Sequence, residues 1–143
     1  MTLSTLNQEL HVARSKRYAL AGLVILGWED AKYYVKAAEE ISCPIILQVG
    51  PNCRKNTPIE IMGPMLKKLA EDASINIVTL LDHSTNLKEC ERALDNGFSS
   101  IMFDGSNMEL NENIDMTCKA VELAKNYGAS VEAELGVVGY DQG

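Results

Sequence analysis

The sequence lacks the patterns that mark several large functional classes. Its four cysteines, Cys43, Cys53, Cys90 and Cys118, form no C-x-x-C pair and no metal-finger spacing, so we expect reduced, unpaired thiols. Its 13 Lys and Arg residues are outnumbered by 20 Asp and Glu residues, and they form no basic stripe. Because binding to a phosphate backbone needs such a stripe, we expect no nucleic-acid partner.

Long apolar runs are also missing. The first run, residues 19–26, is too short to cross a bilayer, and the N-terminal stretch MTLSTLNQELHVARSK has no apolar segment typical of a signal peptide. The chain is nevertheless 46% hydrophobic over 143 residues, which is enough to bury the core of one domain. We therefore predict a soluble cytoplasmic protein, a single domain over residues 1–143, and no membrane association.

Strand and helix patterns alternate along the chain. Residues 3–15 have apolar side chains at helical spacing, and residues 19–26 are apolar throughout, as in a strand buried on both faces. The other predicted strands are residues 45–49, 75–81, 99–103 and 130–135, and the other predicted helices are residues 29–40, 57–72, 87–96 and 109–127. About five strand–helix units in succession predict a parallel sheet.

Individual residues mark the ends and inner faces of these elements. Thr57-Pro58 indicates a helix start, Thr85 or Asn86 can cap the next helix, and Gly97 can end it in a left-handed turn. Residues 50–52 read as a loop. The side chains expected to point inward include Tyr34 in the second helix and Ile114, Cys118 and Val121 in the last one.

Two architectures satisfy this alternation, an open doubly wound sheet and part of a (β/α)8 TIM barrel. An open nucleotide-binding sheet usually has a glycine-rich turn after its first strand, and Leu26-Gly27-Trp28-Glu29 is not such a turn. The α/β pattern therefore favours the barrel. Since a complete barrel needs about 250 residues, the chain is expected to hold its first five βα units, preceded by an N-terminal helix.

Polar side chains follow three of the predicted strands where each strand gives way to a loop. Asp82 and His83 close the apolar run that ends at Leu81, Asp104 follows the next strand, and Glu134 lies near the end of the last one. In parallel α/β folds, the carboxyl ends of strands are where ligands and metals are held. These four residues are therefore the candidate site.

The motifs in this part of the chain resemble those of a known family. The stretch LLDHSTNLKECERALDNGFSSIMFDGSNMELNENI, followed by VEAELG, is similar to the class II, zinc-dependent ketose-bisphosphate aldolases. The resemblance extends over nearly the whole chain and implies a TIM barrel, a divalent metal that is usually zinc, and aldol cleavage of fructose or tagatose 1,6-bisphosphate. It also implies residue roles: Asp82 as the catalytic acid/base, His83 as the first zinc ligand, and Asp104 and Glu134 as acidic metal positions, with Glu132 a weaker candidate.

Departures from the family pattern leave activity open. They affect positions near the expected substrate and metal: Leu23-Val24, Gly50, Leu80, Ser84, Asn107, Val137 and Tyr140. Family members take two further zinc histidines and much of the phosphate site from later strands, and His11, the only other histidine, is expected to be an exposed helical residue. One histidine with distant carboxylates is expected to hold zinc weakly or not at all.

Two hypotheses therefore stand. In the first, the chain belongs to a metal-dependent aldolase whose site is completed by a partner chain or by residues missing from this sequence. In the second, it is a catalytically inactive, truncated remnant that forms homo-oligomers through the open sheet edges at its first and fifth predicted strands. The sequence does not choose between fructose and tagatose bisphosphate.

Overall fold

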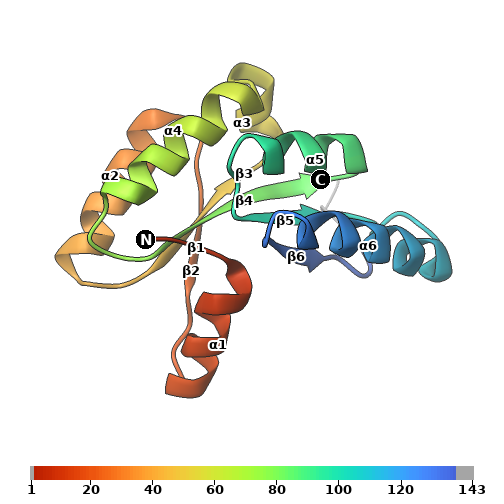
Figure 1. The fold of residues 1–143 in the computed structure, drawn as a ribbon, viewed down its shortest axis with the longest axis horizontal. Coiled ribbons are helices and arrows are strands. Elements are labelled where there is room, and N and C mark those ends of the chain that lie inside the picture. Colours follow the sequence, from red (N-terminus) through yellow and green to blue (C-terminus); the bar gives the residue numbers. More distant parts are fainter. Residues whose placement is uncertain (1, 138–143) are drawn as a thin grey trace, which may run out of the picture.

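The computed structural model describes residues 2–137, which form a six-stranded parallel sheet flanked by helices (Figure 1). Tyr140, one of the departures named above, lies outside the described residues. The strands are β1 (Leu3–Ser4), β2 (Ala21–Val24), β3 (Ile45–Val49), β4 (Ile77–Ser84), β5 (Ser100–Phe103) and β6 (Ser130–Ala133). The helices are α1 (Leu6–Lys16), α2 (Trp28–Glu40), α3 (Pro51–Asn56), α4 (Ile59–Asp72), α5 (Leu87–Asp95) and α6 (Leu110–Lys125).

The strands lie side by side in the order in which the chain makes them. The order is β2-β3-β4-β5-β6, every pairing is parallel, and the short β1 pairs with the start of β4, where Leu3 lies opposite Ile77. The parallel sheet of βα units predicted from the sequence is therefore confirmed. Because all the strands are parallel, their carboxyl ends lie along one edge of the sheet, where the candidate residues meet.

The two faces of the sheet have separate cores. Leu47, Leu81 and Phe103 belong to the larger core, which helices α2, α4, α5 and α6 cover. The alternate residues Ile46, Leu80 and Met102 form a smaller core on the opposite face, together with Leu6 of α1. Side chains alternate between the faces of a strand, so the two sets follow from the strand period of two. Figure 1 shows α1 apart from the other helices.

Helix α1 is fixed to the sheet by its first turn. Thr5 caps it and forms a capping box with Gln8, and the backbone amides that follow reach the strands. The Leu6 amide donates to Ser100 Oγ and the Asn7 amide to Ser130 Oγ, each at 3.0 Å. The first amides of a helix have no partner within the helix, so these two serines satisfy donors that would otherwise be left free.

Several predicted element boundaries are wrong. Strand β4, predicted to end at Leu81, continues through Asp82 and His83 to Ser84. Residues 3–4 form strand β1 rather than a helical turn, because Thr5 is the N-cap and pairing with β4 continues up to it. Residues 50–52 are not a loop: helix α3 begins at Pro51, a position where the missing amide of proline costs nothing. Thr57 ends α3, and Pro58 rather than Thr57 is the N-cap of α4.

Some predicted faces are also wrong. Strand β2 is largely exposed, because within the described residues it has only β3 as a neighbour. Tyr34 is 37% exposed rather than inward. Helix α6 does not bury Ile114, Cys118 and Val121. It buries the smaller side chains of Asn113, Ala120 and Ala124, which allow a closer approach to the sheet.

All four cysteines are free: Cys43 and Cys118 are exposed, and Cys53 and Cys90 are buried. Burial raises the pKa of the Cys53 and Cys90 thiols, so neither is a reactive thiolate near neutral pH. Within residues 2–137, no helix combines the length and apolarity needed to cross a membrane.

Candidate metal centre

A bulge at the end of β4 presents the Asp82-His83 step. Between Leu81 and Ser84 the pairing with β5 shifts: Leu81 lies opposite Ile101 and Ser84 opposite Phe103. Between these two pairs, β4 therefore has one residue more than β5. The backbone of His83 is left-handed there, with a φ of 50°. A bulge re-aims side chains, and a positive φ at a residue other than glycine persists only where its surroundings hold it.

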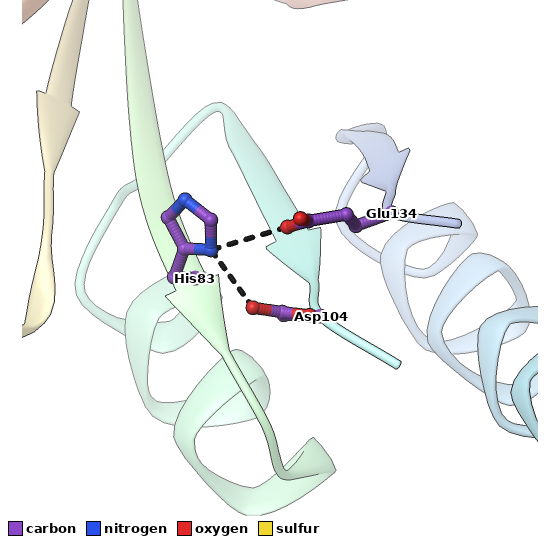
Figure 2. A group of neighbouring side chains, drawn as sticks. All are labelled: His83, Asp104 and Glu134. Atoms are coloured by element: carbon purple, nitrogen blue, oxygen red, sulfur yellow. Dashed lines mark hydrogen bonds and ion pairs between the residues drawn. The ribbon is translucent and has the colours of Figure 1, made fainter. Parts of the chain in front are cut away.

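This bulge turns His83 toward the two acidic residues that the sequence singled out. His83 Nδ1 lies 2.8 Å from Asp104 Oδ2 and 3.3 Å from Glu134 Oε2 (Figure 2). The three side chains come from the ends of β4, β5 and β6, and their ligand atoms all lie within 4.8 Å of one another. The expectation that the carboxylates would be distant from the histidine is therefore wrong. Glu132 is not part of this group.

The spacing and the donor types fit a divalent metal. Neighbouring ligands in a tetrahedral zinc shell lie about 3.3 Å apart when each metal–ligand bond is about 2.0 Å. Zinc accepts imidazole nitrogen and carboxylate oxygen, and a catalytic zinc takes three protein ligands and one open position. Glu134 Oε2 is buried and has no hydrogen-bond partner among residues 2–137, whereas His83 Nδ1 forms its hydrogen bond with Asp104. A buried carboxylate oxygen without a hydrogen-bond donor is compatible with a cation at this point.

Charge within the group perturbs its titration. The hydrogen bond to Asp104 is the main cause that raises the pKa of His83, and the neighbouring carboxylates add to it. Burial acts to raise the pKa of Asp104, but hydrogen bonds from Ser106 and His83 outweigh it and lower that pKa. The group therefore favours a protonated imidazole beside an ionised Asp104 when no metal is bound.

Asp82 is close to this group but faces the other core. It is 8% exposed, and its Oδ1 accepts a hydrogen bond from Gln48 Nε2 at 3.4 Å. Burial raises the pKa of Asp82, although the charges of His83 and Arg54 partly oppose the shift. Gln48 and Glu132 border an open cavity of about 430 Å³ between α1 and the sheet. Asp82 is thus a buried carboxyl with a raised pKa, set apart from the three candidate ligands.

The family described as "Fructose-bisphosphate aldolase class-II" matches residues 4–143. The chain belongs to this family. Class II aldolases generally depend on zinc. The solved structures of the family are TIM barrels, as expected from the sequence, and the sheet of this chain corresponds to part of such a barrel.

Individual relatives agree with the family assignment. The chain is 35% identical over 142 residues to a probable fructose-bisphosphate aldolase of Bacillus subtilis (strain 168), with 97% of the chain and 50% of the relative covered. It is 36% identical over 132 residues to a 6-phospho-5-dehydro-2-deoxy-D-gluconate aldolase of Shouchella clausii, covering 89% and 44%. The crystal structure of the YdjI aldolase from Escherichia coli K12 superposes with a TM-score of 0.89 at 31% identity, covering 98% and 53%. The chain spans about half the length of these aldolases.

Two residues that support this candidate site were missed by the sequence analysis. One is Arg54 in α3, whose guanidinium reaches the backbone of the bulge. It was missed because α3 was read as a loop, and the basic residue in the last turn of a short helix was the only local signal.

The other is Asn113, the middle residue of the family-like ENI motif. Its Nδ2 donates to the Glu134 carbonyl at 2.8 Å, and its Oδ1 accepts from Thr117 Oγ1 at 3.1 Å. A Cβ on Gly105 would lie 2.3 Å from Asn113 Oδ1, so the Asp104-Gly105 turn packs directly against this amide. A polar residue on the buried face of α6 was the available signal, but the periodicity chosen for that helix placed Ile114 inward instead.

Proposed function

We propose that this chain carries part of the active site of a metal-dependent aldolase that cleaves a ketose 1,6-bisphosphate, fructose or tagatose bisphosphate, to glycerone phosphate and glyceraldehyde 3-phosphate. The observation that carries the proposal is the cluster of His83, Asp104 and Glu134 next to the buried carboxyl of Asp82. The family assignment supports it, and the relatives are named as aldolases of phosphorylated substrates.

His83, Asp104 and Glu134 would hold the divalent metal, with zinc favoured by the donor set. When bound, the metal would supply a Lewis acid that polarises the substrate ketone and stabilises negative charge next to it. Asp104 keeps the imidazole of His83 turned toward Glu134, and it stays ionised because its pKa is low.

Asp82 is the proposed acid/base. Its carboxylate takes the proton of the C4 hydroxyl, the C3–C4 bond breaks as the C4 aldehyde forms, and the electron pair of that bond remains on C3 beside the ketone. Return of a proton to C3 completes glycerone phosphate. Burial raises the pKa of Asp82, which makes its carboxylate a stronger base than an exposed one. The hydrogen bond from Gln48 helps to orient it.

The second candidate function is a non-catalytic scaffold that forms homo-oligomers through its sheet edges. It is favoured by the apolar side chains at the β2 edge, where Val24 is 55% and Leu26 61% exposed. Strands β2 and β6 are the outermost strands among the described residues, and unpaired strand edges promote association. Whether residues 1–143 act as one domain stays a prediction.

Zinc binding and aldol cleavage test the two candidates. We expect the chain to bind one zinc per molecule in equilibrium dialysis, His83→Ala to abolish that binding, and His11→Ala, which removes the exposed histidine of α1, to preserve it. Cleavage of fructose and tagatose 1,6-bisphosphate is then assayed with and without zinc. A chain that binds no zinc at micromolar concentration and runs as a defined oligomer in light scattering would support the scaffold instead.

A further inference from the structure

Arg54 makes more hydrogen bonds than any other side chain near the candidate metal centre. Its Nη1 donates to the carbonyls of Val49 and Asp82, both at 2.6 Å, and its Nη2 donates to the His83 carbonyl at 3.1 Å. Its Nε and Nη2 also donate to the Glu89 carboxylate at 3.0 and 3.2 Å. A guanidinium has five N–H donors, and each of them has an acceptor here.

The bonds to Asp82 and His83 lie where the backbone is strained. His83 has a φ of 50°, and the pairing of β4 with β5 is interrupted between Leu81 and Ser84. A bulge frees backbone groups from the ladder, and Arg54 takes up two consecutive carbonyls at that point. The bond to Val49 ties the same guanidinium to the end of β3, so the ends of two strands are fixed relative to each other.

Glu89 anchors Arg54 from the other side. Its carboxylate also accepts a hydrogen bond from Ser84 Oγ at 2.8 Å, and Ser84 is fully buried. Glu89 lies in the first turn of α5, where Asn86 caps its amide at 2.8 Å. The Arg54 side chain is only 9% exposed. Ser84 stands where the family usually has a glycine. Its hydroxyl therefore adds a contact to this ion pair that a glycine cannot make.

We propose that Arg54 is a positioning residue for the metal centre: by holding the Asp82 and His83 carbonyls, it keeps the β4 bulge in the conformation that presents His83 to Asp104 and Glu134. The inference rests on the proposed metal site. Arg54 does not touch the candidate ligand atoms, so its effect on metal binding passes through the backbone of the bulge.

Hydrogen exchange in the metal-free chain tests the hold on the bulge without any metal. The Asp104 amide donates to the Ser84 carbonyl at 2.8 Å and reports opening of the bulge. We expect Arg54→Lys, which keeps the charge but has three donors, to speed exchange of this amide by about tenfold, and Arg54→Met to speed it further. The matched control is Arg92→Lys, which alters a similar pair with Glu60 that is exposed and remote from the bulge.

Zinc titration of the same variants tests the consequence. Changes in the groups that orient metal ligands typically weaken binding by about 10–100-fold, and we expect a loss in that range for Arg54→Lys, with a smaller loss for Ser84→Gly and none for Arg92→Lys. Val35→Ala truncates a buried side chain of α2 and controls for general destabilisation. It should lower the melting temperature and leave the zinc affinity unchanged.

The positioning role would be overturned if the Asp104 amide of Arg54→Lys exchanged at the same rate as in the unsubstituted chain. An unchanged zinc affinity of Arg54→Lys would overturn it as well. If the unsubstituted chain binds no zinc, the proposed function fails, whereas the exchange measurement still decides whether Arg54 holds the bulge. If Arg54→Met does not fold, Arg54→Lys and Ser84→Gly carry the test.

Discussion

The two ends of the candidate metal centre are held by different chemistry. At the His83 end, the backbone is fixed by a nearly buried ion pair between Arg54 and Glu89 with five hydrogen bonds. At the Glu134 end, the backbone is fixed by one neutral hydrogen bond from Asn113. Charged, bidentate contacts are stronger and more directional than a single amide contact. The His83 end is therefore the rigid side of the site, and the Glu134 end is the more adjustable one.

The difference matches what each end has to do. His83 sits at a positive φ, which costs free energy that its surroundings must offset. Glu134 directly follows the last residue of β6 and has no positive φ, and it needs only to be kept near the other ligands. The stronger support is found where the backbone is less favourable.

The largest expected effect comes from removing the charged support. Arg54→Met leaves the Glu89 carboxylate without its charged partner and three backbone carbonyls without this donor, and we expect a loss of about 3 kcal/mol in the free energy of unfolding, measured with urea. Arg92→Met is the matched control: both side chains of its pair with Glu60 are exposed, so no measurable change is expected. Equal losses in the two variants would contradict the contrast between the buried and exposed pairs.

A smaller effect is expected at the neutral support. Asn113→Ala removes a buried amide and leaves the Glu134 carbonyl without its donor, so we expect a loss of about 1–2 kcal/mol in urea unfolding. Asn111→Ala, on the exposed side of the same helix, should be neutral. If Asn113→Ala costs more than Arg54→Met, the Glu134 end is the more strongly held, contrary to our comparison.

The smallest effect is a pH dependence at the His83 end. The pKa of His83 is raised in the folded chain, mainly by Asp104, above its ordinary value of 6.5. This contribution to stability is therefore fully present below about pH 6.5 and is lost as pH rises through the folded pKa. In the metal-free chain, urea unfolding should show this decline, and His83→Gln should lack it. Zinc affinity should change in the opposite direction, because the imidazole must lose its proton to bind the metal.

Much of the fold follows from local patterns in the sequence. Strand β3 was predicted with the bounds that the structure gives, and Asn86 and Gly97 delimit α5 as expected, the former by its side-chain cap and the latter with a φ of 89°. These features depend on residues close together in the chain. The order of the candidate site residues along three strand ends was also predictable, because parallel strands place their carboxyl ends on one edge.

The rest depends on contacts that a linear pattern does not specify. The residues around Pro51 are compatible with either a turn or the start of a helix. Without helix α3, the contact of Arg54 with the bulge could not be predicted. The buried face of α6 was predicted wrongly because the larger apolar residues of this helix, such as Ile114 and Val121, are exposed. The residues that face the core are Asn113, Ala120 and Ala124. The close spacing of His83 and Glu134 arises from a bulge, a tertiary feature of the β4–β5 pairing.

The way α1 is attached has a consequence for the order of folding during synthesis. Its first two amides find their acceptors in Ser100 and Ser130, which lie 94 and 123 residues further along the chain. Helix α1 is synthesised before β5 and β6, so the first amides of α1 find these acceptors only after both strands have been made. Until then, these two amides have only water as a partner, and a nascent chain that stalls before residue 130 lacks the attachment of α1 to β6.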